Sequence, residues 1–144
     1  MPPTERCREE FPDDPEIADS VQMLRRIPPY HIFFDENLGK ARPSSAAFDD
    51  GKDGAPMSVY RRDVMEATGG KIRRVMVGHE GYGLVGINAR HFRARDQTVH
   101  SDPLPTEAAH ALVCGRKTPS SRRFFAHCAF WVIAPPAVES GTTK

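Results

Sequence analysis

One histidine lies in a segment that is predicted to be buried, where its side chain could take part in proton transfer without contact with bulk water. His110 belongs to the mostly apolar run 109–114, whose length is typical of a buried strand. Strand alternation places His110 on one face with Leu112 and Cys114. An imidazole in such a position either forms a structural hydrogen bond in the core or acts as a general acid or base. His110 is therefore the candidate catalytic residue.

Positive charge and hydroxyl groups gather directly after this run. Gly115 ends the run, and Thr118 followed by Pro119 is typical of a helix N-terminus. Such a terminus presents unpaired N–H groups and a partial positive charge, which suit an anion. The alternative is a capped surface helix with solvated arginines. The candidate ligand-binding residues of this turn are Arg116, Lys117, Thr118, Ser120 and Arg122.

The turn is not a complete phosphate-binding P-loop. Gly115 is followed by Arg116, Lys117 and Thr118, but the first glycine of the Gly-x-x-x-x-Gly-Lys spacing is replaced by His110. We therefore exclude a Walker motif.

A second candidate ligand loop contains Arg42, Ser44 and Ser45. A guanidinium presents a planar fork to phosphate or carboxylate, and the two hydroxyls add donors. Pro43 restricts Arg42 to an extended backbone. These residues lie in the stretch 35–56, which lacks clear periodicity, and loops of that length are usually functional or disordered. The alternative is a turn with one solvent-exposed arginine.

The sequence gives no strong indication of a metal or a cofactor. It lacks the His-x-x-x-His and His-Glu-x-x-His spacings, and the aspartates of 49–53 do not fit an EF-hand loop. We expect neither metal nor cofactor. A serine–histidine–aspartate set can be assembled from Ser45, His110 and Asp102, but no Gly-x-Ser-x-Gly motif supports it.

Composition and charge describe an ordinary globular chain. The 144 residues are 39% hydrophobic and 27% charged, with a formal net charge of +1, so no overall electrostatic attraction to nucleic acid exists. Basic residues are instead concentrated locally, including the segment 90–95. The odd number of cysteines, three, favours free thiols in a reducing compartment. No run approaches the ~20 apolar residues that span a membrane. We expect a cytoplasmic protein without membrane contact.

The elements that must position these residues predict an α+β fold. We expect a single domain over 14–133, between a flexible lead (1–13) and a flexible tail (134–144), with a mixed or mainly antiparallel sheet and three to four helices packed on one side. The expected helices are 14–26, 61–67, 88–95 and one from Pro119 whose apolar stripe includes Trp131. The expected strands are 30–34, 57–60, 71–77, 83–87, 97–100 and 109–114, with 71–77 and 83–87 forming a hairpin.

Three function classes fit these patterns. The first is a small cytoplasmic protein that binds an anionic ligand, either nucleic-acid backbone or nucleotide phosphate, with phosphoryl-transfer, nucleotidyl-transfer or nuclease chemistry at His110. The second is a non-enzymatic protein-interaction module or accessory subunit. The third is a defence or toxin-type transferase acting on a nicotinamide nucleotide. The third needs an arginine or a histidine, a serine and a glutamate in one cleft, and the candidates are Arg42, Ser44 or Ser58, and Glu66 or Glu80.

Overall fold

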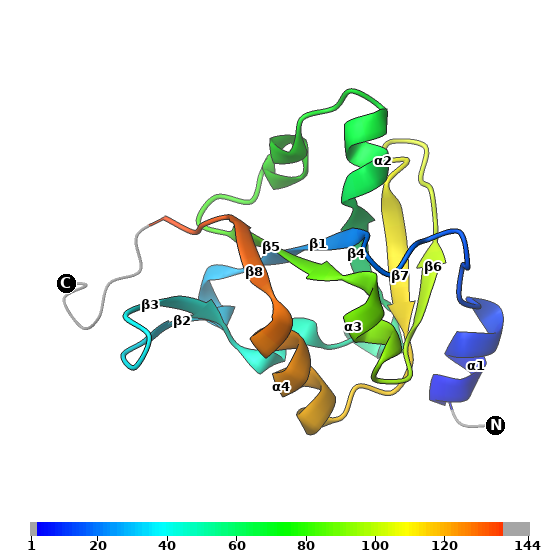
Figure 1. Cartoon of the computed structure of the whole chain (residues 1–144), viewed down its shortest axis with the longest axis horizontal. Coiled ribbons are helices and arrows are strands. Elements are labelled where there is room, and N and C mark those ends of the chain that lie inside the picture. The colour runs from blue at the N-terminus through cyan, green and yellow to red at the C-terminus, as the bar shows by residue number, and fades with distance from the viewer. Residues whose placement is uncertain (1–2, 137–144) are drawn as a thin grey trace.

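The structure is a computed structural model that describes residues 3–136, with side chains described from Cys7 onward. A six-stranded antiparallel sheet runs through it in the order β6-β7-β4-β1-β5-β8 (Figure 1). Its strands are β1 (Gln22–Ile27), β4 (Met57–Arg61), β5 (Gly83–Asn88), β6 (Thr98–Ser101), β7 (His110–Cys114) and β8 (Phe130–Ile133). The helices are α1 (Pro3–Glu10), α2 (Arg62–Ala67), α3 (Ala89–Arg93) and α4 (Pro119–Cys128). The predicted α+β class with a mainly antiparallel sheet is confirmed.

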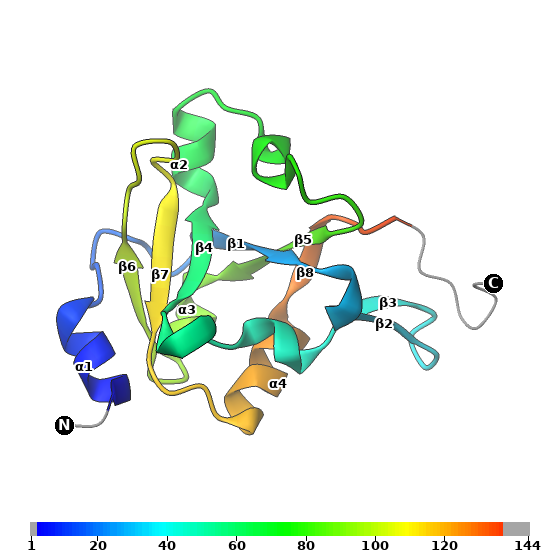
Figure 2. The ribbon, with the colours of Figure 1, turned by 180° about the vertical axis from the view of Figure 1, so that it is seen from behind.

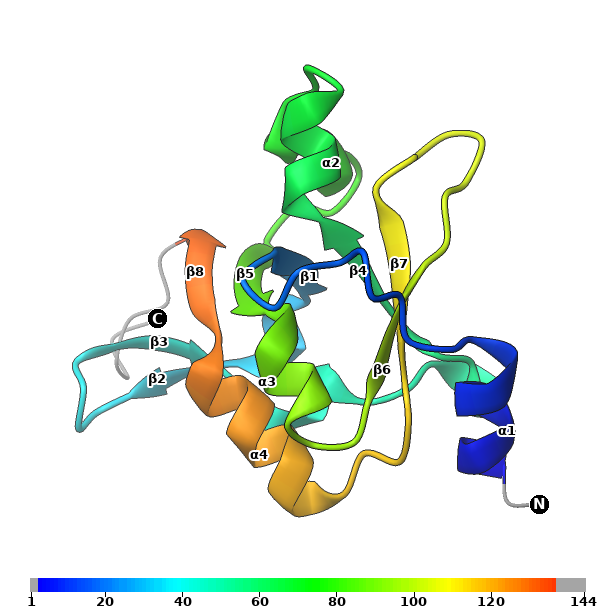
Figure 3. The same ribbon diagram turned by 45° about the vertical axis from the view of Figure 1, so that its right-hand side comes forward.

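Helical segments cover both faces of this sheet. On one face α3 and α4 lie side by side (Figure 3), and the buried cluster there includes Met23, Val59, Phe92 and Phe125. On the other face α2 and the 3₁₀ turn η4 (Ile72–Met76) cover a smaller cluster that includes Leu24. The prediction that all helices pack on one side is wrong, because the central strands bury apolar side chains in both directions.

The segment 14–26, predicted as a helix, contributes the central strand β1 instead. Met23 and Leu24 are both fully buried although they point to opposite faces. β1 pairs with β5 along its whole length and with β4 at its start. These long-range hydrogen bonds override the helical spacing of Ile17, Val21 and Leu24, which suggested an amphipathic helix.

The predicted strand 71–77 and its hairpin with 83–87 are also wrong. Residues 72–76 form η4, and β5 pairs with β1 on one side and β8 on the other. Both edges of β5 are therefore occupied, so no position remains for another strand. The expected strands at 57–60, 83–87, 97–100 and 109–114 are confirmed as β4, β5, β6 and β7, with boundaries that differ by at most one residue.

The last predicted helix is shorter than expected. Thr118 caps α4 as predicted, since its hydroxyl oxygen accepts a hydrogen bond from the backbone N–H of Ser121 at 3.1 Å. The helix ends at Cys128, and Trp131 lies on β8 rather than on the helical stripe. Its indole Nε1 donates to the Ala41 carbonyl at 2.9 Å, which holds β8 against the neighbouring hairpin.

The stretch 35–56 begins in a β-hairpin, which contains Ala41. β2 (Ile32–Asp35) and β3 (Lys40–Pro43) form a two-stranded sheet that extends beside α4 and β8 (Figure 2), preceded by η1 (Pro29–His31) and followed by η2 (Ser45–Phe48) and η3 (Lys52–Gly54).

The predicted flexible lead contains α1, and the part of the predicted tail from 137 to 144 lies outside the described residues. Within the described part of the chain, every helix is too short or too polar to cross a lipid bilayer.

Candidate functional site

His110 lies between an aspartate and a serine. Its Nδ1 is 3.0 Å from Asp102 Oδ2 and 3.1 Å from the Asp102 carbonyl oxygen, and its Nε2 is 3.2 Å from Ser58 Oγ. In the tautomer that carries its proton on Nδ1, this nitrogen donates to the Asp102 oxygens, and Nε2 accepts from the Ser58 hydroxyl. The His110 side chain is 11% exposed. Ser58, His110 and Asp102 therefore have the connectivity of a nucleophile, a base and an orienting acid.

Antiparallel pairing brings these three side chains together. In the register of β4 with β7, Tyr60 lies opposite His110 and Ser58 opposite Leu112. Alternation then places Ser58, Tyr60 and His110 on the same face of the sheet. Asp102 directly follows β6, and its backbone N–H donates to the His110 carbonyl at 2.9 Å. We name this arrangement the Ser58 relay.

The hydroxyl of the relay belongs to Ser58, whereas the set that can be assembled from the sequence, which no motif supports, contains Ser45. Ser45 lies in η2 and lines a different pocket. The signal for Ser58 was present in the alternation of the two predicted strands 57–60 and 109–114, but the sequence did not show that these strands pair.

A small pocket opens beside Ser58. Its volume is about 190 Å³, below the range of roughly 300–1,000 Å³ that drug-sized ligands occupy. It lies on the same sheet face as the relay. Its size suits a compact chemical group such as a phosphate with a small substituent. The lining residues are Arg25, Arg26, Ser58, Tyr60, His79 and Tyr82.

Arg25 holds the backbone around this pocket. The pairing of β1 with β4 stops at Leu24, and beyond it the Arg25 guanidinium donates to the carbonyls of Ser58, at 2.8 Å from Nη1, and Ala47, at 3.0 Å from Nε. Burial, and secondly the neighbouring Arg26, lower the pKa of Arg25 to about 10. Arg25 thus remains a cation at neutral pH and supports the serine-bearing strand.

Arg26 has fewer hydrogen-bond partners than Arg25 among the described residues. Its Nη1 donates to the Val75 carbonyl at 2.8 Å, and its guanidinium lies 5.3 Å from the centre of the Tyr60 ring. Its Nε and Nη2 have no hydrogen-bond partner among the residues that the structure describes. Burial and the charge of Arg26 lower the pKa of His79, which favours a neutral imidazole there. The pocket therefore presents positive charge to an anionic group bound beside Ser58.

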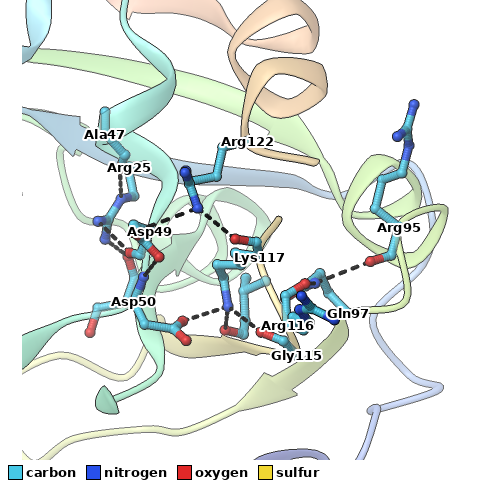
Figure 4. Close-up of polar contacts among 12 residues, drawn as sticks. Arg25, Ala47, Asp49, Asp50, Arg95, Gln97, Gly115, Arg116, Lys117 and Arg122 are labelled. Atoms are coloured by element: carbon cyan, nitrogen blue, oxygen red, sulfur yellow. Dashed lines mark hydrogen bonds and ion pairs between the residues drawn. The ribbon is translucent and has the colours of Figure 1, made fainter. Parts of the chain in front are cut away.

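The predicted cationic turn is largely engaged with the protein's own acceptors (Figure 4). Lys117 Nζ contacts Asp50 Oδ1 at 2.5 Å and donates to the carbonyls of Val113 and Gly115, and its side chain is 1% exposed. Because an ammonium has three donors, none remains for a ligand. Lys117 is therefore a buried structural cation, where the sequence suggested a ligand-binding one.

The other predicted residues of the turn are partly available. Arg122 donates to the Lys117 carbonyl at 2.6 Å and lies 3.8 Å from Asp49 Oδ2, and Thr118 is used as the helix cap. Arg116 and Ser120 are exposed. In the basic segment 90–95, Arg93 forms ion pairs with Asp13 and Asp19, and Arg95 stacks on Phe124 at 4.1 Å. These engagements leave Arg116 as an exposed cation at the turn.

Arg42, Ser44 and Ser45 lie together, but away from His110. They line a groove between the β2–β3 hairpin and α4. The residues named for a nicotinamide-nucleotide transferase do not share one pocket: Arg42 and Ser44 line this groove, Ser58 lines the relay pocket and Glu66 lines a third pocket near α2. Glu80, the other candidate acid, is exposed.

No metal-binding group of three His, Cys, Asp or Glu side chains is present between Cys7 and Pro136. Comparisons with protein-family models, curated proteins and solved structures give no match. The functional assignment therefore rests on the geometry of the chain itself.

One ion pair holds the loop that carries Asp102. Glu107 accepts two hydrogen bonds from Arg74, at 2.8 Å from Nε and 2.7 Å from Nη2, and a third from the Ala109 N–H. The hydrogen bonds from Arg74 are the main cause that lowers the pKa of Glu107. The charged carboxylate thus fastens the loop between β6 and β7 to η4.

This pair predicts an acid-dependent loss of stability. Because the folded-state pKa of Glu107 is lowered, its contribution is present above the unfolded pKa, about 4.3, and is lost as the pH falls through the folded value. We expect Glu107→Gln to cost about 1 kcal/mol at pH 7 and almost nothing below about pH 3. Urea denaturation of both proteins between these pH values measures the difference. A constant difference at every pH would contradict this role of the charge.

Proposed function

We propose that the protein hydrolyses a small phosphoester, with Ser58 as the nucleophile, His110 as the general base and acid, and Asp102 as the residue that orients His110. The observation that carries this proposal is the hydrogen-bonded order Ser58–His110–Asp102 beside a pocket lined by arginine. This function retains the anionic ligand that the sequence predicts, and its proton transfers take place at His110.

The surroundings of Ser58 favour phosphorus over a carboxylic ester carbon. Acyl transfer usually needs two N–H groups that converge on the developing oxyanion. Ser58 lies inside a regular strand, and successive N–H groups of a strand point in opposite directions, so neighbouring ones do not converge. A guanidinium supplies the charge that a phosphoryl group requires, and Nε and Nη2 of Arg26 have no partner among the described residues.

The proposed reaction has two balanced steps. In the first, a bond forms between Ser58 Oγ and phosphorus while the ester P–O bond breaks, and His110 Nε2 takes the serine proton and gives it to the leaving alkoxide. In the second, His110 takes a proton from water as the water oxygen attacks phosphorus, and Ser58 Oγ leaves and recovers that proton. The sum is phosphoester plus water giving alcohol plus phosphate.

Chromogenic substrates test the substrate class. We expect turnover of para-nitrophenyl phosphate, and none above background with para-nitrophenyl acetate. The measurement is the release of para-nitrophenolate under matched conditions. Turnover of the acetate alone would contradict the assignment, because it would indicate acyl transfer.

Replacing Arg26 tests the anion pocket. Arg26→Gln removes the positive charge but can keep a hydrogen bond to the Val75 carbonyl, so we expect the fold to persist and kcat/KM for the phosphoester to fall by about 10–100-fold. The exposed Arg73 provides the matched control, and Arg73→Gln should retain the wild-type kcat/KM. Equal losses in both variants would show that general positive charge, and not the pocket, matters.

A second candidate function, a protein-interaction module, is favoured by one observation. Two large apolar side chains are exposed near the hairpin, Tyr30 at 78% and Leu38 at 53%. If this were the main function, Tyr30→Ser with Leu38→Ser would abolish the protein's cellular role and Ser58→Ala would leave it intact.

A further inference from the structure

The groove between the β2–β3 hairpin and α4 is separate from the relay pocket and larger, at about 440 Å³. The hairpin contributes Phe33 and Arg42, the segment after it contributes Ser44 and Ser45, and α4 contributes Arg123 and His127. None of these residues lines the pocket of the Ser58 relay. The groove therefore needs its own explanation.

An aromatic ring and a guanidinium share one face of the hairpin. Phe33 lies directly opposite Arg42 in the register of β2 with β3, so both side chains project to the same side. Arg42 Nη2 donates to the Ala126 carbonyl on α4 at 3.1 Å, which fixes the guanidinium across the groove. Its other N–H groups have no partner among the described residues. Phe33 is 46% exposed, so a large part of its ring is accessible to a ligand.

Positive charge prevails in the groove. Arg123 reaches it from α4, is exposed and forms no ion pair with a described residue, whereas Asp35 is the one carboxylate that lines it. The two arginines exceed this single carboxylate by one charge, and the hydroxyls of Ser44 and Ser45 add neutral donors. A phosphate next to a planar ring matches this combination, because guanidinium groups bind phosphate in a fork and phenyl rings stack on bases.

We propose that this groove binds a nucleotide, with its phosphate at Arg42 and Arg123 and its base against Phe33. The ligand is either a free mononucleotide or one unit of a single strand, since both present the same chemistry. The groove acts as a binding site apart from the hydrolytic pocket, so its occupation does not require Ser58.

Fluorescence anisotropy with a labelled ten-residue oligothymidylate tests the proposal on the full chain. We expect saturable binding that Arg123→Gln and Phe33→Ala each weaken by at least about fivefold. Loss of one phosphate contact should also reduce the slope of log K against log salt by about 0.7 for Arg123→Gln. Competition by thymidine monophosphate is then measured at a concentration matched in nucleotide units. If it competes, the ligand is the free nucleotide; if it does not, the ligand is a unit of a single strand.

Three control measurements make the outcome decisive. Arg73→Gln, which removes an exposed arginine elsewhere, should leave the affinity unchanged. Arg116→Gln should also leave it unchanged, because Arg116 lies in the turn that precedes α4 and does not line the groove. Ser58→Ala should bind as tightly as the wild type, so a failed hydrolysis proposal and a failed binding proposal can be told apart. Absence of binding to the oligonucleotide and to thymidine monophosphate would overturn the inference. So would an equal loss in Arg73→Gln and Arg123→Gln, or competition by inorganic phosphate as strong as by the nucleotide.

Discussion

Replacing Asp50 with alanine is expected to lower the free energy of unfolding by about 3–5 kcal/mol, because it leaves a buried ammonium without its counter-charge. The Lys117 side chain is 1% exposed, and Asp50 is its sole carboxylate contact among the described residues. The carbonyls of Val113 and Gly115 accept hydrogen bonds from the ammonium but do not balance its charge. Urea denaturation followed by circular dichroism measures the loss.

A double substitution separates lost charge balance from lost packing. Asp50→Ala combined with Lys117→Met removes both charges and keeps an unbranched side chain in the core, so much of the lost stability should return. Glu36→Ala, at an exposed carboxylate in the hairpin turn, should change stability by less than about 0.5 kcal/mol. If Asp50→Ala cost no more than Glu36→Ala, the ion pair would not support the fold as we describe.

Replacing His110 with asparagine is expected to lower kcat for the phosphoester by at least about 10⁴-fold, because the serine loses its proton acceptor. Asp102→Asn should have a comparable effect, since the amide can hold the imidazole in the wrong tautomer. Stopped assays of product release on folded variants measure both rates. His91→Asn, on α3 and away from the relay, should keep the wild-type rate.

Combined variants test whether the three residues work as one unit. Ser58→Ala with His110→Asn should be no slower than the slower single variant, because either change alone disables the relay. Multiplicative losses would instead indicate independent structural effects. Comparable unfolding midpoints for the variants would show that the lost turnover is not lost folding.

The sequence predicted the parts of the site that depend on local pattern. Apolar run length and alternation predicted the strand of His110 and the strand of Ser58, and the Thr118–Pro119 pair predicted the start of α4. These features are fixed by neighbouring residues along the chain. They position His110 correctly but do not identify what it contacts.

The partners of these residues depend on contacts between distant segments. Ser58 meets His110 across 52 positions through strand pairing, and Asp50 meets Lys117 across 67. Spacing along the chain carries no information about such contacts, so the sequence did not show that Ser58 lies beside His110, and it predicted Lys117 as a ligand-binding cation. The two arginines of β1 were missed for a related reason, because their segment was expected to be helical.

Labelling with a fluorophosphonate, which carries an electrophilic phosphorus, tests the reactivity of Ser58 most directly. The label is located by mass spectrometry of the digested protein. The relay predicts one modified serine, Ser58, in the wild type, and loss of that modification in His110→Asn with the fold intact. An unmodified Ser58, or equal labelling of Ser58 with and without His110, would contradict the relay.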